Sequence, residues 1–498
     1  MEAPAFASHH HCKFCRSLSV DCVCIHTLTW QLPPFFRFYL PPGSNTTRHR
    51  MNIPPIIILC DGTWCGRETG TQTNIYRLAE LFGINFSSSD VTDAQVTTPG
   101  PPVQPNVHAR YRHGVGVGST FLDYLFNGVT AQSLGDEVRS AYRFIVDRYQ
   151  PGSEIWLFGL SRGAYTVRCV AGMINNCGIL RRGTHTDQDL KNLCCEAYQM
   201  YRSKHESNLP HSRQSADFRR RYSWPLIGDE LPRQQHFQPP VRFMGLFDTV
   251  GSLGIPTFTG GVGLEWPEFH NNEVSSVVQE VYHLVSVHDR FYIFQPCLAT
   301  RANSHGPVID EEWIPGVHYD LGRQRFRFWR DGGSWVDTVG TVLSKIPFIG
   351  GGQHLEPNNV LSDFALWKML RRIQLGYSGN DLILTNRLQA EIVALQGSIQ
   401  TGAGGAVGDG DVYSQIEQYG PFGSILGKVI KGIAGGLGLW RLFFDQRQRF
   451  IPDDNANVYN FEIGDVSFQG QSVADLAEIT DVRYPARAAQ AWALRQRL

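Results

Sequence analysis

The decapeptide E-I-W-L-F-G-L-S-R-G, residues 154–163, constrains the fold of this chain more than any other stretch. Its apolar β-forming residues lead into a Gly-x-Ser-x-Gly pattern centred on Ser161, and residues 164–173 have the composition of a helix. A serine bent onto a sharp strand-to-helix turn needs glycine two positions before and after it, because a Cβ atom there would clash. The pattern therefore predicts a nucleophile elbow with Ser161 as nucleophile. The alternative interpretation is an ordinary Gly/Ser turn.

Apolar runs and helical patterns alternate on both sides of this elbow. Strand-like runs occupy residues 56–60, 241–247 and 281–287, and residues 131–149 carry apolar side chains at helical spacing. This alternation predicts the α/β class, with a doubly wound, mostly parallel sheet resembling that of α/β hydrolases. Open α/β sheets place their chemistry in the loops at the C-terminal ends of the strands, so these loops are where we expect the site.

The chain divides into three segments by composition. Residues 1–52 form a leader with Cys12, Cys15, Cys22 and Cys24, residues 53–325 the predicted catalytic domain, and residues 326–498 a helical and Gly-rich extension. The C-x2-C-x6-C-x-C spacing of the leader differs from the paired C-x2-C knuckles of zinc sites. We therefore predict a poorly ordered leader and assign no metal ligands, with a zinc site as the alternative.

The C-terminal extension contains a glycine-rich linker, residues 402–410, and two apolar stretches that include glycine and lysine, residues 342–352 and 420–444. The second stretch has two interpretations. It can lie in a lipid interface with Lys428, Lys431 and Arg441 near the headgroups. It can also pack on the domain as a core helix or lid, which we favour because its glycines weaken a free helix.

Composition excludes some classes of function. A formal net charge of -1 and interspersed charges give no field that would attract nucleic acid. The chain has no run of 18 apolar residues and no secretory signal at its N-terminus, so we predict a cytoplasmic protein, with peripheral membrane contact open.

Eleven cysteines are an odd number, and Cys60, Cys169, Cys177 and Cys297 lie in apolar surroundings. Buried free thiols are predicted there.

A serine nucleophile needs an acid and a histidine, which in α/β hydrolases follow it in that order. Asp248 comes directly after the apolar run 241–247 and is the predicted acid, although a turn or helix cap would also suit it. The base is less determined, because six histidines follow Asp248: His270, His283, His288, His305, His318 and His354. His318 follows a strand-like run and precedes a glycine-bounded loop, whereas His283 has the position of a strand-end residue.

Five motifs together resemble one known family. They are D-G-T-W (61–64), H-G-V-G (113–116), F-G-L-S-R-G-A-Y (158–165), F-D-T-V-G-S-L-G (247–254) and P-G-V-H-Y-D-L-G (315–322). In this order they resemble the α/β-hydrolase family of the type VI secretion phospholipase effector catalytic domain, over about residues 54–325. Two positions depart from the family pattern: residues 323–325 read R-Q-R where the family has further glycines, and residues 288–290 read H-D-R where it often has D-E-R.

The resemblance implies roles for particular residues. Ser161 would be the nucleophile, Asp248 the acid and His318 the base. The backbone N–H of Arg162, at the start of the expected helix, would face the oxyanion, and Gly62 or Thr63 would complete the hole. The implied mechanism needs no cofactor and no metal.

The function expected from these observations is hydrolysis of carboxylic esters, with a lipase or phospholipase favoured. An esterase acting on small soluble esters, a peptidase or thioesterase, and a catalytically silent hydrolase fold that serves as a scaffold are the alternatives. The oligomeric state is left open by the sequence.

Overall fold

The computed structural model describes fifteen stretches and two single residues of the chain. They are residues 53–62, 72–86, 93–96, 107–114, 131–203, 205–226, 239–251, 273–286, 289, 294, 296–301, 306–314, 316–325, 357–377, 385–401, 467–468 and 471–472. The chain divides into two units, Met1–Met51 and Asn52–Leu498, and all of these residues belong to the second. The predicted leader and the stretches 342–352, 402–410 and 420–444 lie outside the described residues.

A seven-stranded sheet forms the centre of the second unit, in the order β11-β9-β7-β4-β1-β3-β2. Six strands are parallel and β2 pairs antiparallel with β3. The strands are β1 (Ile56–Cys60), β2 (Asp93–Val96), β3 (His108–Arg112), β4 (Ile155–Leu160), β7 (Val241–Phe247), β9 (Glu280–Ser286) and β11 (Val308–Ile314). The α/β class with a mostly parallel sheet is thereby confirmed. β1 and β7 have the bounds that the sequence predicted.

In the described part of the chain, three short strand pairs lie outside this sheet. They are β5 (Ile179–Leu180) with β6 (Ser223–Trp224), β8 (Glu273–Val274) with β10 (Thr300–Arg301), and β12 (Ser467–Phe468) with β13 (Gln471–Ser472). The helices of the described residues are α1 (Asn74–Leu81), α3 (Ala131–Arg148), α4 (Arg162–Cys177), α5 (Asp187–Arg202), the 3₁₀ helix η2 (Glu206–Asn208), α6 (Arg213–Tyr222), α7 (His318–Gly322), α9 (Asn359–Tyr377) and α10 (Thr385–Thr401).

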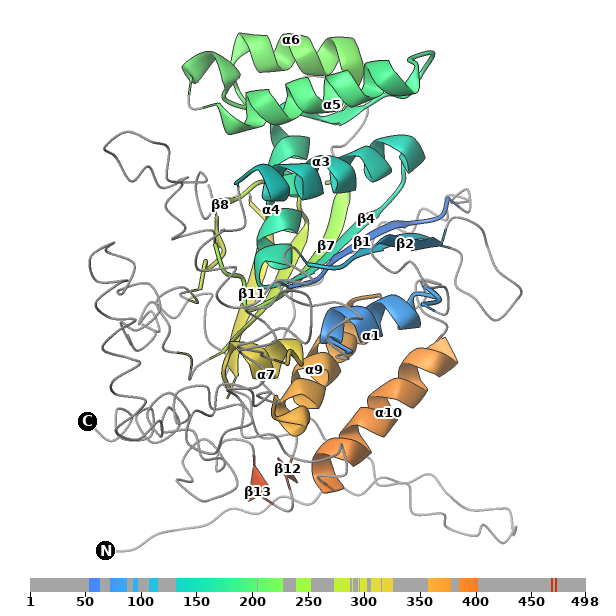
Figure 1. Cartoon of the computed structure of the whole chain (residues 1–498), viewed down its shortest axis with the longest axis vertical. Coiled ribbons are helices and arrows are strands. Elements are labelled where there is room, and N and C mark those ends of the chain that lie inside the picture. Colours follow the sequence, from blue (N-terminus) through green and yellow to red (C-terminus); the bar gives the residue numbers. More distant parts are fainter. Residues whose placement is uncertain are drawn as a thin grey trace, which may run out of the picture. The chain divides into compact units, whose positions relative to one another are not determined.

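Helices cover both faces of the large sheet, and strand periodicity explains how. Ile57 and Leu59 of β1 pack into one hydrophobic cluster, while Ile56, Ile58 and Cys60 pack into another, because successive side chains of a strand point to opposite faces. The first cluster includes residues of α1, α9 and α10, and the second includes residues of α3, α4, α5 and α6. Figure 1 shows these two groups of helices on opposite sides of the sheet.

The C-terminal helices α9 and α10 share the first cluster with the strands. Asp363 of α9 accepts hydrogen bonds from Arg77 Nη1 of α1 at 2.7 Å and from Ser398 Oγ of α10 at 2.9 Å. Asn74 of α1 donates through Nδ2 to the carbonyl of Leu321 in α7 at 2.8 Å. Residues after the predicted boundary at 325 therefore contribute to the core of the sheet, while the boundary itself and a C-terminal lid stay predictions.

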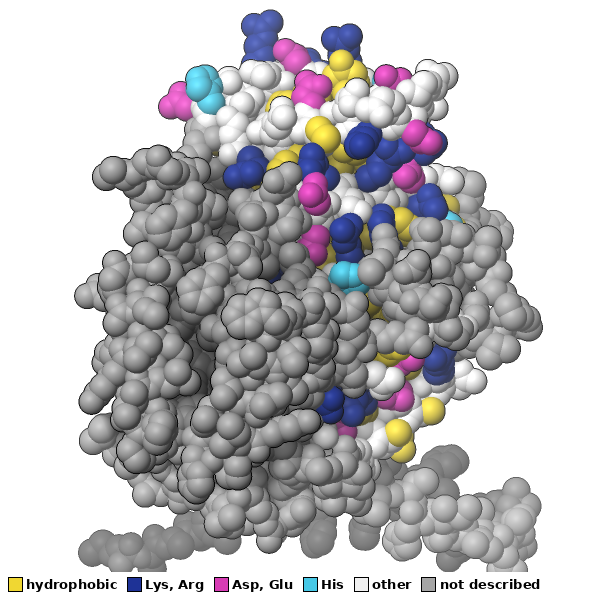
Figure 2. Space-filling model, viewed as in Figure 1, with side chains coloured by type: hydrophobic (Ala, Val, Ile, Leu, Met, Phe, Trp, Pro, Cys, Tyr) yellow, Lys and Arg dark blue, Asp and Glu magenta, His cyan; other side chains and the backbone are white. Residues whose placement is uncertain are grey.

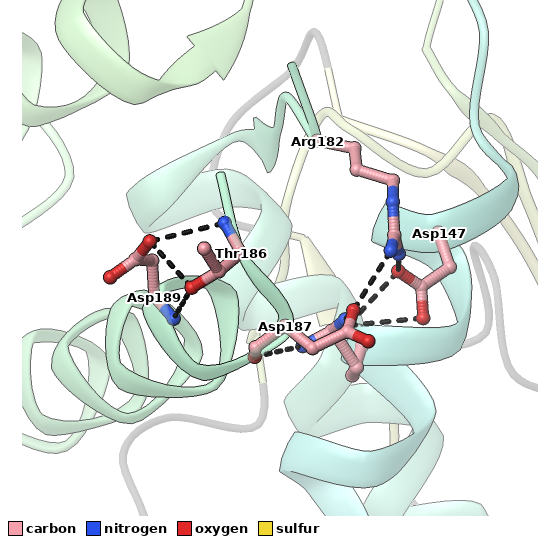
Figure 3. A network of polar contacts seen from close by, with 6 residues as sticks. Asp147, Arg182, Thr186, Asp187 and Asp189 are labelled. Carbon is pink, nitrogen blue, oxygen red and sulfur yellow. Dashed lines mark hydrogen bonds and ion pairs between the residues drawn. The ribbon is translucent and has the colours of Figure 1, made fainter. Parts of the chain in front are cut away.

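The start of α5 is held by a network of polar contacts (Figure 3). Thr186 Oγ1 accepts from the backbone N–H of Asp189 at 3.2 Å, and Asp189 Oδ2 accepts from the N–H of Thr186 at 3.1 Å, which is a capping box. Asp187 forms ion pairs with Arg182 at 2.8 Å and with Arg143 of α3 at 2.9 Å. The ends of α3 and α5 are joined in this way on one face of the sheet.

The four cysteines predicted to be buried free thiols, Cys60, Cys169, Cys177 and Cys297, are buried and form no disulfide. On the face shown in Figure 2, basic and acidic side chains of the described residues are interspersed, in keeping with the net charge of -1. Within the described part of the chain, no helix has both the length and the hydropathy needed to cross a membrane.

Candidate active site

Ser161 lies on the predicted strand-to-helix turn, between β4 and α4. Its backbone has φ 57° and ψ -123°, a conformation that a residue with a side chain rarely adopts. A Cβ atom on Gly159 would lie 2.5 Å from the Ala164 backbone, and one on Gly163 would lie 2.2 Å from the carbonyl oxygen of Cys60. Both glycines of the pattern are therefore required by close backbone contacts, as the sequence predicted, and α4 begins two residues earlier than expected.

The backbone of the turn is fixed to the neighbouring strand β7. The N–H of Ser161 donates to the carbonyl of Phe247 at 2.9 Å, and the N–H of Val250 donates to the carbonyl of Ser161 at 3.3 Å. β4 and β7 are adjacent parallel strands, so the loops that follow them lie side by side at one edge of the sheet.

Asp248 is the first residue of the loop after β7 and is fully buried. Like Ser161, it is a non-glycine residue with a positive φ, here 41°. Its backbone N–H donates to the carbonyl of Leu284 at 2.7 Å, and its Oδ1 accepts from the N–H of Ser286 at 2.9 Å. The neighbouring strand β9 thus holds both the backbone and the carboxylate of Asp248.

His318 connects Asp248 to Ser161. Its Nδ1 lies 2.6 Å from Asp248 Oδ2 and its Nε2 lies 2.8 Å from Ser161 Oγ, and all three side chains are buried. Because an ionised carboxylate only accepts hydrogen bonds, Nδ1 carries the proton and Nε2 accepts from the serine hydroxyl. A hydroxyl that can pass its proton to an imidazole oriented by a carboxylate can attack a carbonyl carbon.

The local structure around His318 differs from the sequence expectation. The expected strand ends at Ile314, and His318 is the first residue of the short helix α7 instead of a loop residue. Asp320 fixes this helix, because its Oδ2 accepts from the N–H of Val317 at 2.9 Å and its Oδ1 accepts from the N–H of Asn358 at 2.7 Å. The imidazole therefore projects from a helix start that is fastened to the segment leading into α9.

The R-Q-R departure begins at the C-terminal end of this helix. Arg323 adopts the left-handed conformation, with φ 52°, that a glycine would adopt with less strain. Its Nε donates to Asn359 Oδ1 at 3.4 Å. The short helix that begins at His318 thus ends in a left-handed cap formed by an arginine.

Two residues that the sequence analysis did not assign contact His318. Asp289 Oδ2 accepts from the backbone N–H of His318 at 2.9 Å, and the Phe294 ring stacks on the imidazole with centroids 4.6 Å apart and planes 11° apart. Asp289 had a signal in the sequence, because it belongs to the H-D-R departure from the family pattern. Phe294 had none, since its place in the sequence run F-Y-I-F (291–294) does not indicate which side chain it contacts.

The residues expected to form the oxyanion hole lie at two places: Arg162 at the start of α4, and Gly62 and Thr63 in the loop after β1. Arg162 follows Ser161 as the first residue of α4, where backbone N–H groups and the helix dipole favour negative charge. The N–H of Gly62 donates to Asp61 Oδ1 at 2.8 Å, and Asp61 Oδ2 accepts from Tyr111 Oη at 2.7 Å. Thr63 lies outside the described residues. The loop after β1 is therefore organised around a buried, hydrogen-bonded carboxylate.

Glu137 of α3 is a buried carboxyl close to the start of α4. Thr166 Oγ1 donates to the carbonyl of Arg162 at 3.0 Å and lies 3.4 Å from Glu137 Oε2. Burial raises the pKa of Glu137 from 4.5 to about 7, although the positive charges of Arg112 and Arg162 oppose the shift. A carboxyl with a raised pKa makes the folded state bind its proton more tightly than the unfolded chain does.

Glu137 should therefore make stability fall as pH rises. From pH 4.5 to about 7 the unfolded chain loses this proton while the folded chain keeps it, which lowers the free energy of unfolding by on the order of 3 kcal/mol. Glu137→Gln should remove that slope and be more stable than wild type at pH 8. Urea unfolding of both proteins at pH 5 and pH 8 measures it. Glu196→Gln, at an exposed position of α5, is the control, and equal slopes in wild type and Glu137→Gln would contradict the prediction.

Comparison with protein families gives one match over more than half of the chain. The model of the family described as T6SS, phospholipase effector Tle1-like, catalytic domain matches residues 55–372. The uncharacterized protein YEL023C of Saccharomyces cerevisiae is 30% identical over 251 residues, which cover 49% of this chain and 33% of that protein. The chain thus spans about a third of the length of this curated relative.

Two solved structures are similar over part of their length. One is the Tle1 effector bound to the VgrG spike from the type 6 secretion system, with 18% identity, a TM-score of 0.26, and coverage of 54% of this chain and 50% of that chain. The other is an uncharacterized protein from Pseudomonas aeruginosa, with 16% identity, a TM-score of 0.30, and coverage of 68% and 48%.

Proposed function

Because the chain belongs to the family of Tle1-like phospholipase effector catalytic domains, we propose that it is a serine hydrolase that cleaves carboxylic esters of lipids. Ser161 is the proposed nucleophile, His318 the base and Asp248 the acid. The observation that carries this proposal is the chain of two hydrogen bonds, 2.8 Å and 2.6 Å long, from the serine through the imidazole to the carboxylate. The strained serine conformation after β4 supports an α/β-hydrolase elbow.

In the proposed mechanism, Ser161 Oγ attacks the ester carbonyl carbon while His318 Nε2 takes its proton. Asp248 holds Nδ1–H and stabilises the imidazolium that forms. The tetrahedral intermediate expels the alcohol, which receives the proton from Nε2, and leaves an acyl group on Ser161. Water then attacks the acyl carbon with His318 again as base, which releases the acid and restores the serine.

The backbone N–H of Arg162 is the first proposed oxyanion donor, because it belongs to the first residue of α4 beside the nucleophile. A second donor from Gly62 requires its N–H to leave Asp61 Oδ1, where it is bound at 2.8 Å. Thr63 is the alternative second donor at the same loop.

A lipid substrate is the part of the proposal that rests on the family. The predicted lid or interfacial segment 420–444, with its basic residues Lys428, Lys431 and Arg441, would suit contact with a membrane surface. A small soluble ester, a thioester or an amide would use the same three residues. A silent scaffold would keep the fold without activating the serine.

The deciding experiment compares untreated protein with protein inactivated by a fluorophosphonate, which reacts with activated serines. Both are incubated with mixed phospholipid vesicles, and released fatty acid is followed, with a short-chain soluble ester alongside. Labelling of Ser161 with loss of fatty-acid release supports the proposal. Turnover of the soluble ester alone would remove the lipid substrate. An unreactive Ser161 with no turnover would favour the scaffold.

A further inference from the structure

A second histidine–carboxylate pair lies beneath the loop that carries Asp248. His283 of β9 and Glu311 of β11 are register partners on adjacent parallel strands, and His283 Nδ1 lies 2.7 Å from Glu311 Oε2. The two side chains are 0% and 1% exposed. Buried polar groups cost stability unless they are hydrogen-bonded, so the partners of this pair are informative.

The other ring nitrogen of His283 shows what the pair holds. The backbone N–H of Thr249 donates a hydrogen bond to His283 Nε2, with a donor–acceptor distance of 3.1 Å. A backbone N–H only donates, so Nε2 is the unprotonated nitrogen and Nδ1 is the one that donates to Glu311. Glu311 Oε2 also accepts from the N–H of Ala299 at 3.1 Å. The imidazole is therefore a fixed bridge between a buried carboxylate and the backbone of Thr249.

Thr249 is fully buried and lies between two residues of the site. Asp248, before it, has a left-handed φ of 41° and binds His318 through its carboxylate. Val250, after it, donates its N–H to the carbonyl of Ser161 at 3.3 Å. A non-glycine residue keeps such a backbone conformation only when its surroundings hold it. The bond to His283 is one of the contacts that hold this turn.

We propose that Glu311 and His283 are positioning residues that hold the Thr249 backbone, and through it the Asp248 carboxylate, in register with His318 and Ser161. This inference rests on the proposed function and adds two residues that do not contact the reacting atoms. Glu311 fixes the tautomer of His283, and His283 supplies the acceptor for Thr249.

Two substitutions at one position separate this role from core packing. An asparagine amide lies at the distance of Nδ1 and keeps a donor for Glu311, but it loses the acceptor for Thr249. A glutamine amide reaches the distance of Nε2 and keeps that acceptor. We expect His283→Asn to lower kcat by about 10-fold to 100-fold with KM changed less than about 2-fold, and His283→Gln to stay within about 3-fold of wild type, because small misplacements cost turnover.

Hydrogen exchange of a peptide that contains Thr249 gives a readout independent of activity. Faster exchange in His283→Asn, but not in His283→Gln, supports the proposal. Equal kcat values in the two variants, or equal exchange, would overturn it. If the wild type has no Ser161-dependent turnover, the proposed function fails and the two variants cannot differ in kcat. The hydrogen exchange of Thr249 then decides the inference by itself.

Glu311→Gln provides a second test if the His283 variants do not fold. Its amide oxygen can accept from His283 Nδ1–H and from Ala299, so the same tautomer is kept. We expect kcat within about 3-fold of wild type and unchanged exchange at Thr249, since the proposed role needs an acceptor and not a charge. Glu311→Leu, which has no acceptor for His283 Nδ1–H, should lose protection at Thr249, and unchanged protection in a folded Glu311→Leu protein would contradict the bridge.

Discussion

Ser161→Ala is expected to lower kcat/KM for the cleaved ester by about 10⁴-fold to 10⁶-fold, because the nucleophile is lost while the hydrogen-bond donors of the site remain. The fold should be unaffected. Serine and alanine both carry a Cβ, so the strain at φ 57° is the same in the two proteins. Initial rates on vesicles and on a soluble ester, together with urea unfolding, measure both expectations. Wild-type activity in Ser161→Ala would remove the proposed function.

The three side chains are expected to act as a unit. The double variant Ser161→Ala with His318→Ala should be no slower than Ser161→Ala alone, because the base has no proton to take once the hydroxyl is gone. Asp248→Asn should cost less than either, since Asp248 orients the imidazole and does not touch the substrate. Losses of Ser161 and His318 that multiply in the double variant would mean that the two residues act independently.

Gly163→Ala should be the most destabilising small substitution at the elbow. Its Cβ would lie 2.2 Å from the carbonyl oxygen of Cys60 and 2.5 Å from that of Asp61. Both contacts are to backbone, which cannot rotate away, so the end of β1 or the start of α4 must move. We expect the free energy of unfolding to fall by about 3 kcal/mol or more, with activity lost as well. Urea unfolding followed by circular dichroism is the measurement.

Gly397→Ala is the matched control for this substitution. Gly397 lies in α10, and nothing lies within 4 Å of the position that its Cβ would occupy. Alanine is a better helix former than glycine, so this variant should gain about 0.5–1 kcal/mol. If both variants unfold at the urea concentration of the wild type, the approach of Gly163 to β1 is not the constraint that we describe.

Local patterns in the sequence were sufficient for much of the fold. β1 and β7 have the predicted bounds, and α3 ends one residue before the predicted helix end. These elements are strongly periodic or continuously apolar, so neighbours along the chain decide their type. The Gly-x-Ser-x-Gly pattern likewise predicted the turn at Ser161, because its requirement for glycine arises from contacts within a few residues and with one adjacent strand.

The proposed base was harder to predict than the proposed nucleophile. Six histidines follow Asp248; the surroundings of His318 made it a candidate, and only the resemblance favoured it over the others. In the structure it begins a helix, where Asp289 accepts from its backbone N–H and Phe294 stacks on its ring. These contacts join segments that are far apart in the chain, so no local pattern indicates them.

The sequence by itself determined the α/β class, the strand-to-helix turn at Ser161 and the position of Asp248 after its strand. Only the tertiary structure decided which side chains support them. Asp289 accepts from the backbone N–H of His318, and His283, paired with Glu311, accepts from the backbone N–H of Thr249. The physical reason is register. His283 and Glu311 meet because β9 and β11 pair in one particular alignment, and a shift of one residue would send either side chain to the opposite face of the sheet.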